Sequence, residues 1–229
     1  MKNLLIVILV SFLFSGILIS QNSLGISTNF NFATIKGSGI DTDKDFLNME
    51  TANFGTIGIN YERMLDPNWT LITGLNYARK GGKSKVSENI ELFGQEIELG
   101  ARLVHRMGYL EVPALFQYKF NSNKSKVSPF IFFGPLFSYE TGYEIGVKAH
   151  ILVDINLFSY DVDLGNDVFN RYDIAAMAGG GLSIPVRKGE IKLNASYVYG
   201  FMDVLDDPVL DFNLKHRNIR TGIAYVYNF

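Results

Sequence analysis

A period-two alternation of apolar and polar residues, which recurs eight times along the chain, constrains the fold most strongly. In its first occurrence, Leu24, Ile26, Phe30 and Phe32 are separated by small or polar residues. This period places successive side chains on opposite faces of a β-strand, so each segment has one apolar and one polar face. The eight segments span residues 24–33, 57–62, 69–78, 109–120, 130–139, 174–184, 191–200 and 218–229.

The lengths of these segments favour strands that cross a membrane. A tilted membrane strand needs about 9–11 residues, whereas a strand of a soluble domain averages about 5–6. Most of the segments reach the membrane length, and segment 57–62 is expected to extend at both ends. Eight is an even number, and it is the smallest usual strand count of an outer-membrane barrel.

The connections between the segments alternate strictly between short and long. The short ones are 66–68, 121–128 and 187–189, and the long ones are 36–54, 81–105, 142–172 and 203–216. Outer-membrane barrels have short periplasmic turns and long extracellular loops, whereas a soluble sandwich gives no reason to collect every long loop at one end. The sequence therefore predicts an all-β, eight-stranded antiparallel up-and-down transmembrane β-barrel with four long outer loops.

Composition agrees with this architecture and excludes several classes of protein. Hydrophobic residues make up 47% of the chain and charged residues 19%, which is too apolar for a disordered chain. The net charge of −2 rules out a basic nucleic-acid scaffold as the leading interpretation. The chain has no cysteine, so disulfides, thiolate zinc sites and thiol nucleophiles are excluded. In water, the aromatic-rich apolar faces would form a large exposed patch, whereas lipid solvates them.

The first twenty residues have the pattern of a secretory signal. Lys2 precedes the apolar stretch 4–14, and the small residues Ser15, Gly16 and Ser20 follow it. The alternative is a transmembrane anchor, but the apolar run to Ile19 is shorter than the ~20 residues that span a bilayer. We expect residues 1–20 to be a cleaved signal peptide and residues 21–229 to form the barrel domain.

The polar faces carry charges that the closed barrel would enclose. An eight-stranded barrel is just wide enough for side chains to fill it, and buried charges need partners. We expect Glu62, Glu111, Lys192 and Arg220 to form an internal charge network, with Lys119 a further inward charge. A structural plug is the favoured interpretation of this network, and a gated polar path is the alternative.

Several segments resemble a known family. The stretch 109–120, the adjoining 129–135, the glycines 179–181 and the segments 197–201 and 225–229 resemble the PorT-like outer-membrane β-barrel family of the Bacteroidetes. The resemblance covers about residues 21–229, and 109–135 is its most specific part. It implies an outer-membrane location. The founding member is implicated in type IX protein secretion and gliding, but the matching motifs are architectural.

The C-terminal residues Tyr225, Tyr227 and Phe229 resemble the signal that the barrel-assembly machinery reads. The partners that we expect are this machinery, outer-membrane lipid and lipopolysaccharide, and a secretion or surface protein. We expect no nucleic-acid partner.

Residues suited to catalysis or metal binding are few. We expect His105, His150 and His216 to be solvated in or beside outer loops, because their spacing suits no metal site. Asp41 and Asp45 begin a calcium-like stretch, but Phe46 and Ala52 replace the glycine and glutamate of an EF-hand. The outer loops are expected to form a solvated anionic surface, with cation bridging to glycolipid or contact with a basic partner as alternatives. Its residues are Asp154, Asp161, Asp163, Asp167, Asp173, Asp203, Asp206, Asp207 and Asp211.

The sequence thus predicts an integral outer-membrane barrel with a side-chain-filled interior and no catalytic, cofactor or metal site. We expect a structural or interaction role at the cell surface, such as an accessory to protein secretion. A small-solute or ligand-binding barrel is the second hypothesis. A membrane-embedded hydrolase built from outer-loop residues is the third.

Overall fold

The computed structural model describes residues 22–38, 51–92, 95–120, 127–150, 154–162, 171–202 and 213–229. These parts of the chain contain nine β-strands: β1 (Asn22–Ser38), β2 (Ala52–Met64), β3 (Trp69–Leu92), β4 (Gln95–Lys119), β5 (Ser128–His150), β6 (Asp154–Val162), β7 (Tyr172–Val186), β8 (Gly189–Gly200) and β9 (Asn213–Asn228). No helix in the same parts is long and apolar enough to cross a membrane. The predicted signal, residues 1–20, lies outside the described residues.

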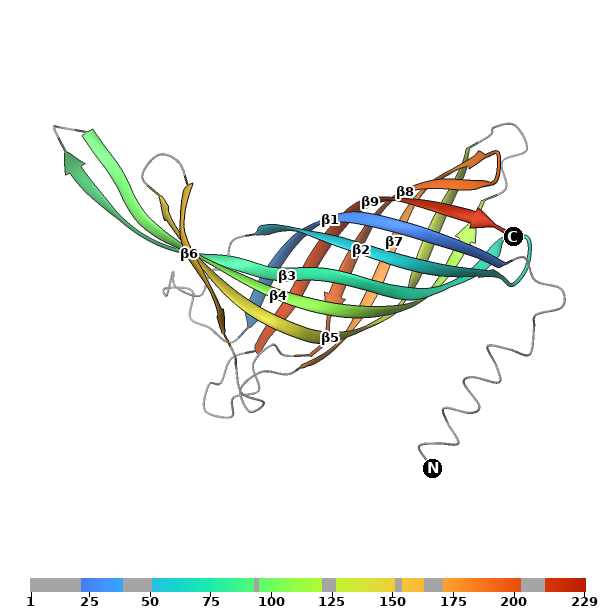
Figure 1. Ribbon diagram of the computed structural model, residues 1–229, viewed down its shortest axis with the longest axis horizontal. Helices are drawn as coiled ribbons and strands as arrows, with labels where there is room; N and C mark the ends of the chain where they lie inside the picture. Colours follow the sequence, from blue (N-terminus) through green and yellow to red (C-terminus); the bar gives the residue numbers. More distant parts are fainter. Residues whose placement is uncertain are drawn as a thin grey trace, which may run out of the picture.

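Eight of these strands close into a barrel in which every neighbour is antiparallel. The pairing runs β1–β2–β3–β4–β5–β7–β8–β9, and β9 pairs back onto β1. The two ends of the sheet therefore meet, and each barrel strand has a partner on both sides (Figure 1). This closure confirms the predicted all-β, eight-stranded up-and-down barrel. It also satisfies the backbone hydrogen bonds that hydrocarbon cannot satisfy.

The outer wall of the barrel is an apolar band. Ile26 is 63% exposed, Phe30 73% and Ile57 66%, whereas Asn31 and Thr56 on the opposite face are buried. The same division holds on β5, where Phe133 and Phe137 point outwards and Phe130, Phe132 and Leu136 are buried inside. The inward and outward faces that the alternation predicts are confirmed on each barrel strand.

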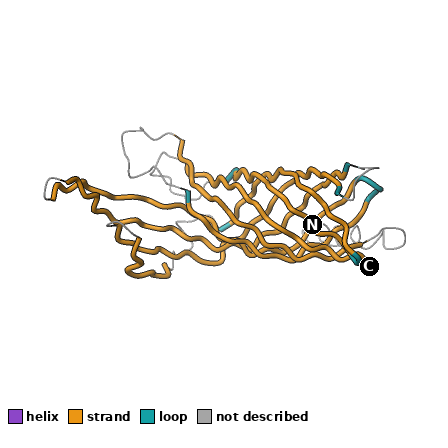
Figure 2. Tube along the Cα trace, turned by 90° about the horizontal axis from the view of Figure 1, so that it is seen from above, coloured by secondary structure: helices purple, strands orange, loops and turns teal. Residues whose placement is uncertain are grey.

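Three barrel strands, β3, β4 and β5, continue past the apolar band, and β6 joins them to form a projecting sheet (Figures 1 and 2). β3 and β4 remain paired as far as Leu92 and Gln95. β5 pairs with β7 over Ser128–Tyr139 and then with β6 over Tyr143–His150. The four strands β3, β4, β5 and β6 therefore extend the sheet beyond the barrel.

The projecting sheet corrects two of the predicted loops. Residues 81–92 and 95–105, and residues 142–150 and 154–162, are strands rather than loops. The apolar alternation ends where the bilayer ends, because outward side chains there meet water. Backbone pairing continues without that signal, so the sequence pattern underestimates the length of β3, β4 and β5. The other two long connections lie mainly at 39–50 and 203–212, outside the described residues.

Candidate functional site

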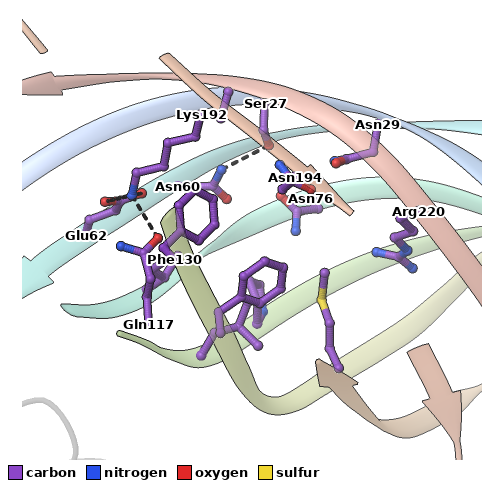
Figure 3. Close-up of a pocket in the computed structure, with 16 residues that line it drawn as sticks. Ser27, Asn29, Asn60, Glu62, Asn76, Gln117, Phe130, Lys192, Asn194 and Arg220 are labelled. Carbon is purple, nitrogen blue, oxygen red and sulfur yellow. Dashed lines mark hydrogen bonds and ion pairs between the residues drawn. The ribbon is translucent and has the colours of Figure 1, made fainter. Parts of the chain in front are cut away.

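The barrel lumen contains two buried ionic clusters. The first lies towards the end of the barrel with short turns. There Lys192 on β8 donates to both carboxylate oxygens of Glu62 on β2, at 2.8 and 2.6 Å, and to Oε1 of Gln117 on β4 at 3.0 Å (Figure 3). Lys192 is 4% exposed and Glu62 8%. The ammonium group also lies 5.7 Å from the centre of the Phe130 ring.

The second cluster lies closer to the projecting sheet. Arg220 on β9 donates two hydrogen bonds to Glu111 on β4, at 2.7 and 2.8 Å. Lys80 on β3 lies 3.0 Å from Glu111 and 3.3 Å from Asp173 on β7, and it donates to Ser138 Oγ at 3.1 Å. Arg220, Glu111, Lys80 and Asp173 are buried. Two cations and two carboxylates thus balance each other in the lumen, which burial requires.

The four residues predicted to form one network therefore belong to two clusters, Glu62 with Lys192 and Glu111 with Arg220. Lys119, the fifth predicted inward charge, pairs with Glu190 at the end with short turns.

Sequence reasoning missed two members of the second cluster. Asp173 was assigned to an outer loop, but it is the second residue of β7 and points inwards. Lys80 lies just past the predicted end of its strand at Ala78. Continuing the same alternation by one step places Lys80 inside, so a signal for Lys80 was present in the sequence.

A small cavity lies in the lumen beside these clusters. Its volume is about 80 Å³, and its lining includes Glu62 and Lys192 from the first cluster and Arg220 from the second. The polar wall is rich in amides, and the apolar wall contains Phe130 and Phe132. Phe130 and Phe132 pack with Leu115, Ile72 and Met177. The lumen is therefore filled by ion pairs and an apolar cluster, with room left for a few water molecules or one very small solute.

The histidine predictions are wrong for two of the three residues. His216 lies in β9 and is buried in the lumen, with Nε2 3.2 Å from the hydroxyl of Tyr109. His105 lies in the projecting part of β4, half-buried, with its ring stacked on Tyr143. Both belong to strands that are longer than the apolar pattern indicates. The side chain of His150 lies outside the described part of the structure, as do residues Asp41 and Asp45.

The electrostatics of the His105 pair follow from its burial above the apolar band. Burial lowers the pKa of His105, because it disfavours the charged imidazolium. Burial, with the nearby charge of Glu140, raises the pKa of Tyr143 to about 12. Both side chains are therefore neutral at neutral pH.

The described residues offer little for metal binding or nucleophilic catalysis. They contain no group of three His, Cys, Asp or Glu side chains that could hold a metal ion. Ser138 touches Lys80, but Lys80 lies between the carboxylates of Glu111 and Asp173. Lys80 donates its hydrogen bond to Ser138 Oγ, so Ser138 is the acceptor in this contact.

The residues of the predicted assembly signal lie on the outer wall. Tyr225, Tyr227 and Phe229 are exposed; the two tyrosines lie among the last residues of β9, and Phe229 follows its end at Asn228. Their recognition by the barrel-assembly machinery stays a prediction.

A closed barrel with an apolar outer band and a polar, filled interior defines an integral outer-membrane protein. The family model described as "Outer membrane protein beta-barrel domain" matches residues 19–206. The chain belongs to this family, and its location is the outer membrane. This confirms the predicted location.

Several solved structures are similar to the chain at low sequence identity. Ail, the attachment invasion locus protein of Yersinia pestis, is 16% identical, with 90% of this chain and 99% of Ail covered and a TM-score of 0.38. Neisserial surface protein A is 13% identical, with 88% and 96% covered and a TM-score of 0.40. OprG from Pseudomonas aeruginosa is 12% identical, with 92% and 95% covered and a TM-score of 0.38. No curated protein matches the chain.

Proposed function

We propose that the protein is a non-enzymatic outer-membrane scaffold that presents its projecting sheet to another protein at the cell surface. The observation that carries this proposal is the combination of a filled lumen with a four-stranded sheet, made of β3, β4, β5 and β6, beyond the apolar band. A filled lumen leaves no open path for solutes. A sheet that projects past the membrane offers surface and open strand edges to a partner.

The partner in this proposal is a component of protein secretion or surface assembly. The support is the resemblance of stretch 109–135 to the PorT-like barrels of the Bacteroidetes, whose founding member is implicated in type IX secretion. Folding by the barrel-assembly machinery, through Tyr225, Tyr227 and Phe229, belongs to the same proposal.

The test of this role is crosslinking from the projecting sheet in intact cells. A photoreactive amino acid at Tyr160 on β6, which is 70% exposed, should capture a partner protein. The same amino acid at Ile223 on β9, in the apolar band, should capture lipid but not that partner. Loss of the Tyr160 crosslink on removing a secretion component would support the secretion role. Equal crosslinking from both positions would contradict an interaction surface on the sheet.

A small-solute barrel is the second candidate, and the cavity favours it. Asn76 and Arg220, which line the cavity, each keep one buried polar atom without a partner among the described residues. Such atoms could bind a small polar solute.

Planar-bilayer recording separates the two candidates. The scaffold proposal expects no steady ion conductance from the wild-type protein. A variant with Glu62→Gly, Lys192→Gly and Phe130→Gly removes one ion pair and part of the apolar cluster, and it serves as the positive control. Steady conductance of the wild type would favour transport and contradict the filled lumen.

A further inference from the structure

Two barrel strands, β9 and β3, carry outward-facing cations just beyond the apolar band. These cations lie at the end of the barrel nearest the projecting sheet. On β9, Arg217 and Lys215 continue the outward column of Ile223 and Ile219. On β3, Arg79 and Lys83 continue the outward column that contains Tyr77. We call these four cations, Arg79, Lys83, Lys215 and Arg217, the basic rim. Only β1 and β2 separate β3 from β9 around the barrel, so the rim occupies one side of the wall.

Arg217 is held in place within the rim. Its guanidinium carbon lies 3.5 Å from the centre of the Tyr199 ring, and Nη1 donates to the carbonyl oxygens of Gly200 and His216, each at 2.9 Å. The Tyr199 ring in turn packs against Phe201, with ring centres 5.4 Å apart. A stacked, hydrogen-bonded guanidinium loses little freedom when it binds an anion.

No carboxylate that the structure describes on the outer wall pairs with the rim. Among the side chains that the structure describes on the outward faces of the strands, Glu144 is the one carboxylate, and it pairs with Arg106. The buried carboxylates Glu62, Glu111 and Asp173 face the lumen and pair with other cations. Apart from Glu144, the described strand carboxylates thus lie on the inner side of the sheet while the rim cations face outwards, although the net charge of the chain is −2.

We propose that the basic rim binds the phosphate groups of an anionic glycolipid in the outer leaflet of the membrane. The ligand would be amphipathic, because the rim directly continues lipid-facing columns. Its acyl chains would contact Ile219 and Tyr77, and its phosphates would reach Arg217 and Arg79. Guanidinium and ammonium groups at a membrane surface attract anionic headgroups, and arginine binds phosphate in a bidentate manner.

The test is a lipid titration of the full protein in neutral dodecylmaltoside micelles. The probes are lipid A, a glycolipid with two phosphates, and zwitterionic phosphatidylcholine, with bound lipid counted by native mass spectrometry. The basic rim should bind lipid A in preference to phosphatidylcholine. Inorganic phosphate at millimolar concentration should leave lipid A bound.

Two double variants separate the rim from general charge effects. Lys215→Gln with Arg217→Gln should weaken lipid A binding about 25-fold, because each basic residue at a membrane surface contributes about 1 kcal/mol. Arg187→Gln with Lys188→Gln removes the same charge from the β7–β8 turn at the opposite end and should change binding less than about twofold. Arg79→Gln with Lys83→Gln tests the β3 half if the β9 variant does not fold. Arg217→Lys should lose only part of the affinity for lipid A, because it keeps the positive charge but not the planar guanidinium group that stacks on Tyr199.

Four results would overturn the proposal, three of them from lipid binding and one from competition with phosphate. The lipid-binding results are equal binding of phosphatidylcholine and lipid A by the wild type, lipid A binding that survives both rim variants, or an equal loss in the Arg187 and Lys188 control. Displacement of lipid A by inorganic phosphate would reassign the rim to free anions and would also overturn a lipid site.

Discussion

Glu111 on β4 and Arg220 on β9 face each other across the full width of the barrel and share two hydrogen bonds, at 2.7 and 2.8 Å. Three strands separate β4 from β9 on either side of the ring. Lys80 approaches the same carboxylate at 3.0 Å. Glu111 therefore joins two cations from different walls, and the cluster depends more on this carboxylate than on either cation.

This asymmetry predicts that substituting Glu111 and substituting Arg220 lower the stability of the barrel by different amounts. Arg220→Gln leaves Glu111 paired with Lys80. Glu111→Gln leaves Arg220 and Lys80 with Asp173 as the remaining carboxylate of the cluster among the described residues. Removing one partner of a buried ion pair costs about 3–5 kcal/mol. We expect Glu111→Gln to lower the free energy of unfolding by an amount at the upper end of that range, and Arg220→Gln by an amount at the lower end.

Urea unfolding in lipid vesicles, followed by the emission of the single tryptophan, Trp69, measures these costs. Glu144→Gln is the matched control, because its ion pair with Arg106 is partly exposed. Pairs of that kind contribute about 0.2–1 kcal/mol. An Arg220→Gln variant that is less stable than Glu111→Gln would contradict the central position of the carboxylate.

Variants of Glu62 and Lys192 should affect stability differently from those of Glu111 and Arg220. Here one carboxylate pairs with one ammonium group, whereas Glu111 pairs with two cations. Lys192→Met should destabilise the barrel by about 3–5 kcal/mol, since Glu62 loses the one cation with which it pairs among the described residues. The double variant with Glu62→Leu should recover most of that stability, because it leaves no buried charge unpaired. A double-mutant cycle measured by the same unfolding transition checks this. Equal instability of the single and double variants would mean that Lys192 acts through packing against Phe130 rather than through its charge.

Much of the barrel was predictable from the sequence, because hydrocarbon outside and a filled lumen inside impose opposite demands on alternate residues. Phe130 and Phe132 could be assigned to the lumen although both are apolar, since Ile131 and Phe133 continue the outward column. The identity of ion-pair partners was not predictable. Glu62 meets Lys192 because of the strand tilt and the register of closure, which no local pattern encodes.

The projecting sheet was not predictable for a related reason. Above Tyr139 the outer face meets water, so the alternation loses its contrast. The register of β5 also shifts there, because Gly108 pairs with Gly142 and Tyr109 pairs with Glu140, which leaves Thr141 as an extra residue. The pairing of β6 depends on the part of β5 beyond this bulge. A sequence pattern that stops at the bilayer surface therefore cannot identify β6.

Gly81 marks the point where β3 leaves the barrel, and it predicts a local effect. Its φ is +150°, and a β-carbon there would collide with the carbonyl oxygen of His105. Gly81→Ala should therefore separate β3 from β4 above the barrel, at a cost of about 1–3 kcal/mol. Limited proteolysis should cut the projecting hairpin faster in this variant while the barrel stays intact.

Gly142 is the control for this substitution. It lies in β5 of the same projecting sheet, and a β-carbon there meets nothing within 4 Å. Gly142→Ala should leave the cleavage rate unchanged or slower. Similar protease sensitivity of the two variants would show that the close approach at Gly81 does not limit the stability of the hairpin.

The stacked pair of His105 and Tyr143 predicts how the projecting sheet responds to pH. Burial lowers the pKa of His105 in the folded sheet below its usual 6.5, so the folded state binds a proton less readily than the open state. The sheet is therefore fully stable above pH 6.5. It loses stability as the pH falls from 6.5 through the folded pKa of His105, and the loss levels off below that value.

Amide hydrogen exchange of β4 and β5 above Gly108, measured between pH 7.5 and 4.5 and corrected for intrinsic exchange, checks this expectation. Protection of these amides should fall across that window in the wild type. His105→Gln has no proton to gain, so its protection should stay flat, and amides near Val112 in the membrane band should stay protected in both proteins. An equal loss of protection in the His105→Gln variant would assign the pH response to another group of the sheet, with Glu140 and Glu144 as the neighbouring carboxylates. The Tyr143 hydroxyl, with its pKa raised to about 12, stays protonated throughout this window and contributes nothing to the change.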